Sequence, residues 1–459
     1  MAELSAVRLA TGAVPFSDNA HASDALLAFS QETGRRFLFI HEEPRDHWYP
    51  GDGIGAAYQA GVNRCHDSPR VLVAHVRYRQ PGGEDAVFEA EARLLRQAGH
   101  RVSVLDLGHT QFDRLGPVTR AAITAHYADH RYGRRLVAEA IDRFRPDVVH
   151  FHNLYPLLGP GAIAEADRLG CATLQTLHNY RLSCLNGRYV RNAEICESCK
   201  PAHFAAGVRS SCYRGSRTQS LLVGRATTRQ WQNFVSRGTP LYWLALSPFV
   251  RQFYVGLGAP AERIVVKANS VDAGEPIERK GRSGVFCGGR LSPEKGIVPL
   301  MRAWPDDAPM LTVAGDGPIE DEVRAAVKHN VRFLGRLEQQ SMRAALRKAL
   351  VVAMPSVWPE PLPLVALEAF AEGTPVVAFA GWSLGSVVGE LSSQCVVTFR
   401  DFPGLARRAL ELTTAANWQT LSERCVDLWR SMYSHPVNRE ALLSIYAAAL
   451  ALKRSSTRL

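Results

Sequence analysis

The sequence predicts an α/β protein with two doubly wound domains of parallel strands. At residues 70–107 a β-branched run, a glycine-containing loop, a helical pattern and a second apolar run follow one another, which is how a doubly wound sheet begins. Residues 273–283 are polar and combine glycine, proline and mixed charge, as expected of a linker. Beyond that linker a second strand–helix alternation starts. A chain of 459 residues is also too long for one ordinary core, so two or three domains are expected.

The first domain is expected at 70–272, after an N-terminal extension, 1–69, whose pattern indicates no particular structure. A cysteine-rich insertion at 184–212 interrupts its alternation. Its strands are expected at 70–76, 98–107, 147–152, 172–177, 241–246 and 263–267. One helix is expected to end near residue 97, and further helices are expected at 134–144, 160–169, 217–236 and 248–257.

The second domain is expected at 284–430, followed by a C-terminal helix and tail at 431–459. The last stretch, roughly 401–452, is predicted to be helical. Its strands are expected at 284–287, 309–314, 331–335, 351–354, 375–379 and 394–398, with helices between them.

Bulk composition narrows the classes of function. The chain carries 54 basic and 44 acidic residues, a net charge of +10, which indicates an anionic partner. Nucleic acid is not expected, because the sequence has no helix-turn-helix pattern, aromatic RNA-binding motif or long Lys/Arg block. No apolar run reaches the roughly 18 residues of a membrane span, and the N-terminus lacks the basic-then-apolar order of a signal peptide. We therefore expect a cytoplasmic protein with reduced cysteines.

The segment 354–378 carries two carboxylates eight residues apart. Glu360 lies in a proline-punctuated loop at a helix entrance, and Glu368 lies about two turns along that helix on a nearby face. The helix is otherwise apolar, so Glu368 is costly to bury without a polar partner. A polyhydroxylated ligand above the strand ends would provide that partner, beside a helix N-terminus that favours phosphate.

A glycine turn after the first strand of the second domain carries two cations. Gly289 and Arg290 follow the strand and Lys295 lies at a helix start, so two positive charges and free backbone amides surround one point. Arg290 can hold a diphosphate through two hydrogen bonds, and Lys295 adds a point charge. The turns at 314–318 and 333–335 follow the next two strands.

These motifs make the chain resemble the family-four retaining nucleotide-sugar glycosyltransferases, whose GT-B fold has two facing Rossmann-like domains. The motifs are the E-x7-E segment, the G-x-Arg…Lys-Gly turn, and the first-domain stretches at 75–85, 147–153 and 176–184. The first-domain stretches are similar to those of a subgroup common in bacterial surface-polysaccharide assembly. The resemblance covers roughly residues 70–430 and implies that the final helices cross back to the first domain.

The resemblance implies a nucleotide diphosphate sugar as donor and a role for each motif residue. Arg290 and Lys295 would meet the diphosphate, Glu368 the ribose hydroxyls and Glu360 the sugar hydroxyls. His178, which follows a strand end, would approach the donor sugar. The family generally needs no metal for catalysis, and no Asp-x-Asp motif is evident at a plausible donor site.

Two loops would complete the donor site. The Gly82-Gly83 pair would approach from the first domain, since glycine lets a backbone come close to a ligand. A plain tight turn is an equal interpretation of the pair taken alone. Because the prolines on both sides of Leu362 lack an N–H, phosphate contacts from the second-domain loop are left to Leu362, Leu364 or Val365.

The acceptor is expected to be a glycan or a polyprenyl-linked saccharide. A basic amphipathic helix at 217–236, with Arg217, Arg225 and Arg229, would bring an anionic membrane surface or a lipid-linked acceptor to the first domain. An arginine-decorated core helix is an equally good interpretation of that pattern. Other functions stay open: a catalytically silent nucleotide-sugar-binding homologue, or another GT-B enzyme such as a nucleotide-sugar epimerase or a phosphorylase.

Four of the nine cysteines cluster in the insertion: Cys184, Cys196, Cys199 and Cys212. Their C-x11-C-x2-C-x12-C spacing would let four thiolates bind a structural zinc ion tetrahedrally. Four sulfur ligands leave no open position, so such an ion would hold the loop rather than take part in catalysis. A set of reduced thiols is the alternative interpretation.

Overall fold

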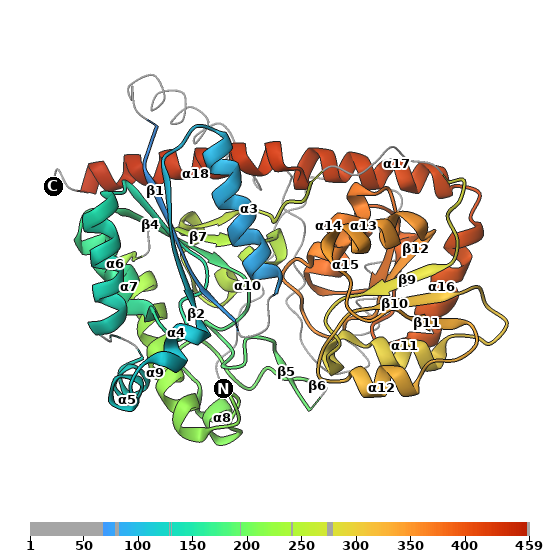
Figure 1. Ribbon diagram of the computed structural model, residues 1–459, viewed down its shortest axis with the longest axis horizontal. Helices are drawn as coiled ribbons and strands as arrows, with labels where there is room; N and C mark the ends of the chain where they lie inside the picture. Colours follow the sequence, from blue (N-terminus) through green and yellow to red (C-terminus); the bar gives the residue numbers. More distant parts are fainter. Residues whose placement is uncertain are drawn as a thin grey trace, which may run out of the picture.

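The computed structural model describes residues 68–456, except 79–81, 128, 130, 193, 240–241 and 273–278. Two parallel sheets of six strands each lie side by side, with helices on their faces (Figure 1). The prediction of two doubly wound domains is therefore confirmed. Nearly all of the expected N-terminal extension and the first part of the expected linker lie outside the described residues.

The first sheet has the strand order β2-β1-β3-β4-β7-β8. Its strands are β1 (Val71–Arg77), β2 (Val102–Gly108), β3 (Val148–Phe151), β4 (Ala172–Leu177), β7 (Tyr242–Ala245) and β8 (Ile264–Val266). β3 and β4 are buried along their whole length, as expected of inner strands of a parallel sheet that is covered on both faces. The order reverses between β1 and β3, and a ligand crevice is expected at the carboxyl ends of strands flanking such a reversal.

Helices cover both faces of this sheet. The helices of the first domain are α3 (Gly83–Gln97), α4 (His109–Arg114), α5 (Pro117–Ala125), α6 (Arg131–Phe144), α7 (Gly159–Arg168), α8 (Ala205–Arg209), α9 (Arg217–Gln232) and α10 (Pro248–Gly256). Of these, α8 packs against α9. The sequence did not predict α4 or α5, because this stretch has little apolar pattern: α5 buries only Ile123. A short hairpin, β5 (Val190–Arg191) with β6 (Glu194–Ile195), was also not predicted.

The second sheet repeats the plan with the order β11-β10-β9-β12-β13-β14. Its strands are β9 (Val285–Gly288), β10 (Leu311–Ala314), β11 (Val331–Phe333), β12 (Val351–Met354), β13 (Val376–Phe379) and β14 (Val396–Val397). Its helices are α11 (Ile297–Ala303), α12 (Glu320–Ala325), α13 (Gln339–Lys348), α14 (Leu364–Ala371), α15 (Trp382–Gly389), α16 (Phe402–Thr414) and α17 (Trp418–Leu428). Here the order reverses between β9 and β12, the two strands that precede the cation turn and the Glu360 loop.

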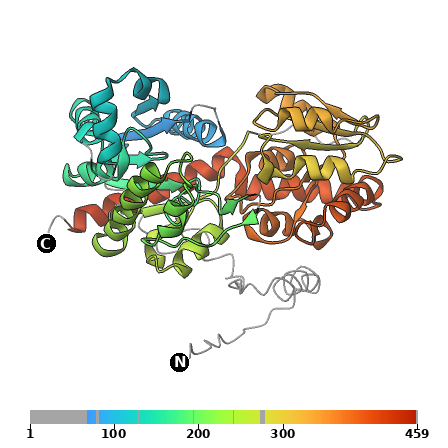
Figure 2. The same cartoon turned by 90° about the horizontal axis from the view of Figure 1, so that it is seen from below.

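The last helix, α18 (His435–Ser456), crosses back to the first domain (Figures 1 and 2). Ile445 and Tyr446 are buried in one hydrophobic cluster with Val71 of β1 and Leu174 of β4. Before the helix starts, the Val271 N–H donates to the carbonyl of Tyr433 at 3.0 Å. The crossing implied by the resemblance is therefore present.

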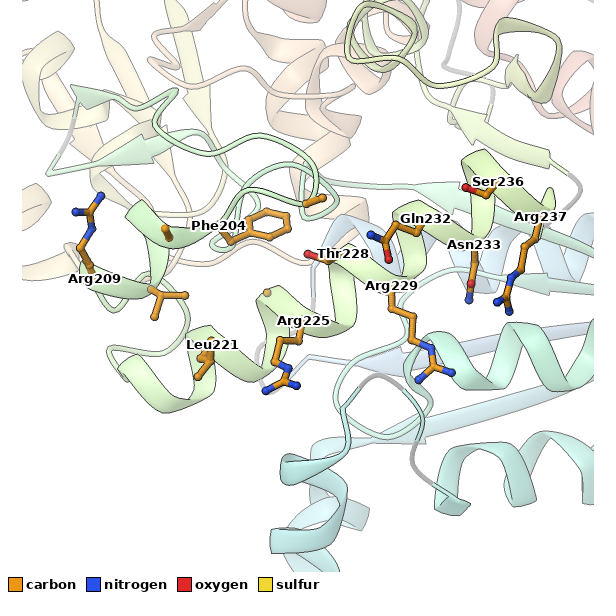
Figure 3. Close-up of a pocket in the computed structure, with 14 residues that line it drawn as sticks. Phe204, Arg209, Leu221, Arg225, Thr228, Arg229, Gln232, Asn233, Ser236 and Arg237 are labelled. Carbon is orange, nitrogen blue, oxygen red and sulfur yellow. The ribbon is translucent and has the colours of Figure 1, made fainter.

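A groove of about 1060 Å³ runs along α9 on the first domain (Figure 3). It is lined by the four arginines Arg209, Arg225, Arg229 and Arg237. Among the described residues, only Arg229 of these four has an ion pair, with Asp129 at 3.5 Å. Trp231 and Phe234 pack into the core, whereas Leu221 is 47% exposed beside the arginines. One face of this helix therefore packs into the core, and the other exposes arginines and an apolar side chain to solvent.

Candidate active site

Three glycine loops meet at the carboxyl edge of the second sheet. The Gly289 N–H donates to Ala314 O at 3.0 Å, and the Gly315 N–H donates to Gly335 O at 2.8 Å. A side chain on Gly315 would place its Cβ 1.9 Å from Gly289 O, and the φ of +150° at Gly315 is one that other residues rarely adopt. The turns after β9, β10 and β11 that the sequence singled out therefore lie together.

The two cations of the first turn differ in their surroundings. Arg290 is exposed and has no ion pair within the described part of the chain. Lys295 ends a short 3-10 turn, and its Nζ lies 2.6 Å from Glu360 Oε2. The turn packs closely on the loop from β12, because a Cβ on Gly296 would lie 2.1 Å from Pro355 O. Lys295 and Glu360 are thus brought together by two strands that flank the reversal in strand order.

Glu360 is fixed by two partners. It is 4% exposed, and its carboxylate accepts from the Ser356 hydroxyl as well as from Lys295. The Lys295 ammonium also lies 5.8 Å from the centre of the Trp358 ring. Sequence reasoning missed the Lys295–Glu360 pair and assigned the two residues separate contacts. An ammonium has three N–H donors, so Lys295 retains two for a ligand oxygen.

The first turn of α14, which starts four residues after Glu360, has free backbone donors. Pro363 is its N-cap residue and no side chain caps the helix, so the N–H groups of Leu364 and Val365 remain available to an anion. Glu368 lies one turn further on, four residues after Leu364. Its carboxylate has no hydrogen-bond partner among the described residues. Burial raises the pKa of Glu368 to about 7, with Arg343 opposing the shift and Glu372 adding to it. The raised pKa agrees with the free-energy cost that the sequence predicted for burying the Glu368 carboxylate without a polar partner.

The glycine pair of the first domain reaches this helix. A Cβ on Gly83 would lie 3.4 Å from Leu364 Cδ1, and the Gly82 N–H donates to Asp85 Oδ2 at 2.7 Å. The Asn269 side chain donates to the carbonyl of Leu362 at 3.2 Å from the same side. Both domains therefore contribute backbone to the entrance of α14.

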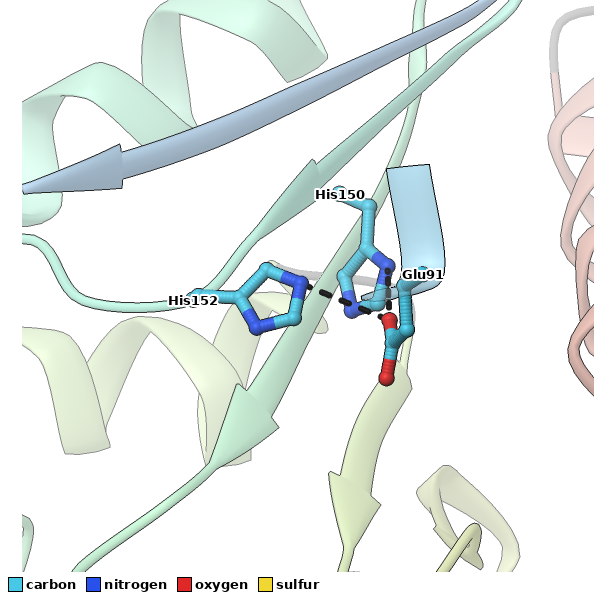
Figure 4. A group of neighbouring side chains, drawn as sticks. All are labelled: Glu91, His150 and His152. Carbon is cyan, nitrogen blue, oxygen red and sulfur yellow. Dashed lines mark ion pairs between the residues drawn. The ribbon is translucent and has the colours of Figure 1, made fainter. Parts of the chain in front are cut away.

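His178 lies just beyond the end of β4. It is backed by a buried polar network, of which Figure 4 shows Glu91, His150 and His152. His178 Nε2 lies 2.8 Å from His152 Nδ1, and His152 Nε2 lies 3.4 Å from the carboxylate of Glu91. Glu91 forms a buried ion pair with Lys267. Burial holds the pKa of His178 well below its ordinary range, with His152 adding to the effect, so the imidazole is neutral at neutral pH. Glu91 and Lys267 were not predicted, although a lysine as the last residue of the strand expected at 263–267 was a visible signal.

Ligand atoms of Glu91, His150 and His152 lie within 4.8 Å of one another, but they do not form a metal site. The two ring nitrogens of His150 lie 2.8 Å from the hydroxyls of Tyr446 and Thr176. The Glu91 carboxylate already neutralises the Lys267 ammonium, which would repel a metal cation. The cluster is therefore a network that orients His152 and, through it, His178.

Family models match both domains. The model described as Glycosyltransferase Family 4 matches residues 81–275, and the model described as Glycosyl transferases group 1 matches residues 282–415. The chain is a family-four-like GT-B glycosyltransferase. This glycosyltransferase is 29% identical over 328 residues to glycogen synthase of Mycobacterium tuberculosis, over 64% of its own length and 70% of that protein.

Two further similarities concern a lipid glycosyltransferase and a solved structure. A phosphatidyl-myo-inositol mannosyltransferase of Mycobacterium leprae is 31% identical over 193 residues, which are 38% of this glycosyltransferase and 49% of that protein. Anabaena HepE, solved in complex with UDP and glucose, superimposes with a TM-score of 0.55, covering 83% of this chain and 100% of that chain. At 16% identity the likeness to HepE shows the fold alone.

A polar cavity of about 30 Å³ adjoins His178 in the first domain of the glycosyltransferase. Asn179 Nδ2 donates to Glu84 Oε1 at 3.0 Å, while Glu84 Oε2 is buried and has no hydrogen bond to any residue that the structure describes. Burial raises the pKa of Glu84. Arg181 also lines the cavity, so the wall facing His178 offers both acceptors and donors.

Proposed function

We propose that the protein is a retaining glycosyltransferase that moves a sugar from a nucleotide diphosphate sugar to a glycan or lipid-linked acceptor, in surface polysaccharide or glycolipid biosynthesis. The observation that carries the proposal is the convergence of Lys295, Glu360 and the uncapped first turn of α14 where the second sheet reverses its strand order. Cations and backbone amides suit a diphosphate, and fixed carboxylates suit sugar hydroxyls. HepE, with the same fold, was solved with UDP and glucose.

The residues divide the work of transfer. Arg290, Lys295 and the amides of Leu364 and Val365 stabilise the charge on the departing diphosphate, which is the largest catalytic contribution expected. Glu368 accepts from the ribose hydroxyls. Glu360 holds hydroxyls of the donor sugar, and His178 approaches that sugar from the first domain. The acceptor attacks the face from which the diphosphate leaves, so that a leaving-group oxygen takes its proton.

No cofactor is required in this scheme, because the protein's own cations and amides balance the charge of the leaving group. We expect transfer to proceed without added divalent cations. The two domains and their shared entrance to α14 exclude water from the reacting centre, which limits hydrolysis of the donor.

A donor panel tests the proposal. The protein is incubated with UDP-, GDP- and ADP-sugars, with and without glycan and polyprenyl-linked acceptors, and the anomeric configuration of the product is read by NMR. Transfer with the donor's configuration kept is expected. An epimerase would convert the donor without an acceptor, and a silent homologue would bind donor without consuming it; either result would overturn transfer. An inverted product would overturn retention.

The groove along α9 supports an acceptor carried on an anionic membrane surface at the cytoplasmic face. Arg209, Arg225 and Arg237 have no ion pair among the described residues, and Leu221 adds exposed apolar surface. No described helix combines the length and apolarity needed to cross a bilayer. The M. leprae relative is named for a phosphatidyl-myo-inositol substrate, which is a membrane lipid.

Flotation with anionic liposomes tests this surface. Wild-type protein is expected to float at low salt and not at high salt, whereas Arg225→Glu/Arg229→Glu should stay unbound. Arg302→Glu/Arg332→Glu, which changes two exposed arginines of the second domain, is the matched control and should float as wild type does. Equal loss in both double variants would show a net-charge effect rather than a site.

A further inference from the structure

The four cysteines of the insertion line one small cavity, Cys184, Cys196, Cys199 and Cys212. Its volume is about 10 Å³, at the lower limit for one water molecule. None of the four forms a disulfide with another cysteine in the described part of the chain. Gly207 of α8 permits the close packing, because a Cβ there would lie 3.1 Å from Cys199 Sγ. Four sulfurs separated by up to 28 residues are thus gathered around a space of atomic size.

The sulfurs have few other partners. Cys184 Sγ lies 3.1 Å from Asn186 Oδ1, and Cys196 Sγ lies 3.5 Å from Ser198 Oγ; thiols are weak hydrogen-bond donors. No three of the four sulfurs lie mutually within 4.8 Å. Tetrahedral zinc with Zn–S bonds of about 2.3 Å places sulfurs about 3.8 Å apart. A bound ion would therefore draw the cysteine side chains inward.

The same insertion carries a hairpin that reaches the second domain. β5 and β6 lie between the two domains in both views (Figures 1 and 2). Ile195 is 8% exposed and belongs to the hydrophobic core of the second domain. Arg188 Nη1 lies 2.6 Å from Glu294 Oε1, and Arg400 Nη1 lies 2.7 Å from Glu194 Oε1. The apolar side chains of Val190 and Ile195 and two ion pairs therefore join the hairpin and the residue that leads into it, Arg188, to the second domain.

The Arg188 contact ends beside the donor site. Glu294 directly precedes Lys295, and its carbonyl accepts from the Val357 N–H at 2.9 Å, within the loop that leads to Glu360. A displaced hairpin would therefore act on Lys295 through the adjacent Glu294, and on the loop that holds Glu360 through Val357.

We propose that Cys184, Cys196, Cys199 and Cys212 bind one zinc ion and that this ion fixes the hairpin as a clamp between the two domains. Cys184 precedes β5 and Cys196 directly follows β6, so an ion bound to both closes the chain into a loop with the hairpin inside it. The metal site is independent of the proposed function. The effect of the clamp on donor binding rests on that function.

Metal content is tested first. Elemental analysis of untagged protein is expected to find about one zinc per chain, and cobalt in its place should show the visible absorption of a tetrahedral thiolate centre. Cys196→Ser/Cys199→Ser should abolish both signals. Cys171→Ala changes a buried cysteine outside the insertion and should keep them. Substoichiometric zinc that is equal in the wild type and the double variant, or a disulfide among the four cysteines, would overturn the metal site whether or not the protein transfers sugar.

The clamp is tested by hydrogen exchange over residues 188–195 and by donor KM. Cys196→Ser/Cys199→Ser should speed exchange in this segment. Arg188→Ala should keep its zinc and raise the donor KM about three- to tenfold. Lys200→Ala, at an exposed position of the insertion, is the control for both. Zinc loss without faster exchange would overturn the clamp, and faster exchange confined to zinc-free variants would support it even if no donor has been found.

Discussion

The carboxyl group of Glu368 allows a test of the donor site that needs no acceptor. Burial raises the pKa of Glu368 to about 7 from an ordinary value of 4.5. At ~1.4 kcal/mol for each tenfold change in proton affinity, this corresponds to about 3 kcal/mol of lost stability once the group is ionised. We predict that Glu368→Gln, which cannot ionise, is more stable than wild type at about pH 8 and gains little at about pH 5.

The sign of this pH dependence follows from whether the folded or the unfolded state binds the Glu368 proton more tightly. Because the pKa is raised in the folded protein, the folded state holds the proton more tightly than the unfolded chain does. The stability contributed by this proton is fully present below pH 4.5 and is lost as the pH rises through about 7. Thermal unfolding across this range should show a difference of several degrees that grows with pH. Glu338→Gln, at an exposed position, is the control. A stability difference independent of pH would refute the assigned burial.

Donor binding should favour the ionised carboxylate, because ribose hydroxyls donate to it. The affinity for a nucleotide sugar is therefore expected to rise as the pH approaches about 7 and to level off above that value. A nucleotide sugar is preferable to a nucleoside diphosphate here, because its phosphates do not titrate in this range. Calorimetric titration of Glu368→Gln should give a flat profile, and a wild-type slope in this variant would contradict the ribose contact.

Three further substitutions test other parts of the site. Lys295→Ala should lower kcat about 100-fold in steady-state assays, and unchanged turnover would exclude contact with the leaving group. Glu91→Gln leaves the buried Lys267 ammonium without its countercharge and should cost about 3–5 kcal/mol in denaturant unfolding; a loss below about 1 kcal/mol would contradict the buried pair. Gly82→Ala has no atom within 4 Å of its Cβ, so its melting temperature should match wild type while the donor KM rises; an unchanged KM would make the glycine a plain turn.

The local sequence pattern was enough to predict the fold and part of the candidate site. Strands such as Val351–Met354 are buried over their whole length, so the sequence shows them as apolar runs. Glu360 stood out because it lies in a recognisable loop. Its pairing with Lys295 joins residues 65 positions apart, and the pair of Glu91 with Lys267 spans 176 positions. No local pattern encodes such partners, since they are set by which strands become neighbours in the sheet.

The position of α18 in the first domain affects when that domain can fold during synthesis. Leu442, Ile445 and Tyr446 form one wall of the first domain's core, against Val71. In sequence they come after the whole second domain, so a ribosome adds them later. Until then the nascent first domain exposes apolar surface, and His150 lacks its Tyr446 partner. The N-terminal half is therefore expected to depend on chaperones during synthesis and to become stable only when the second half has been made.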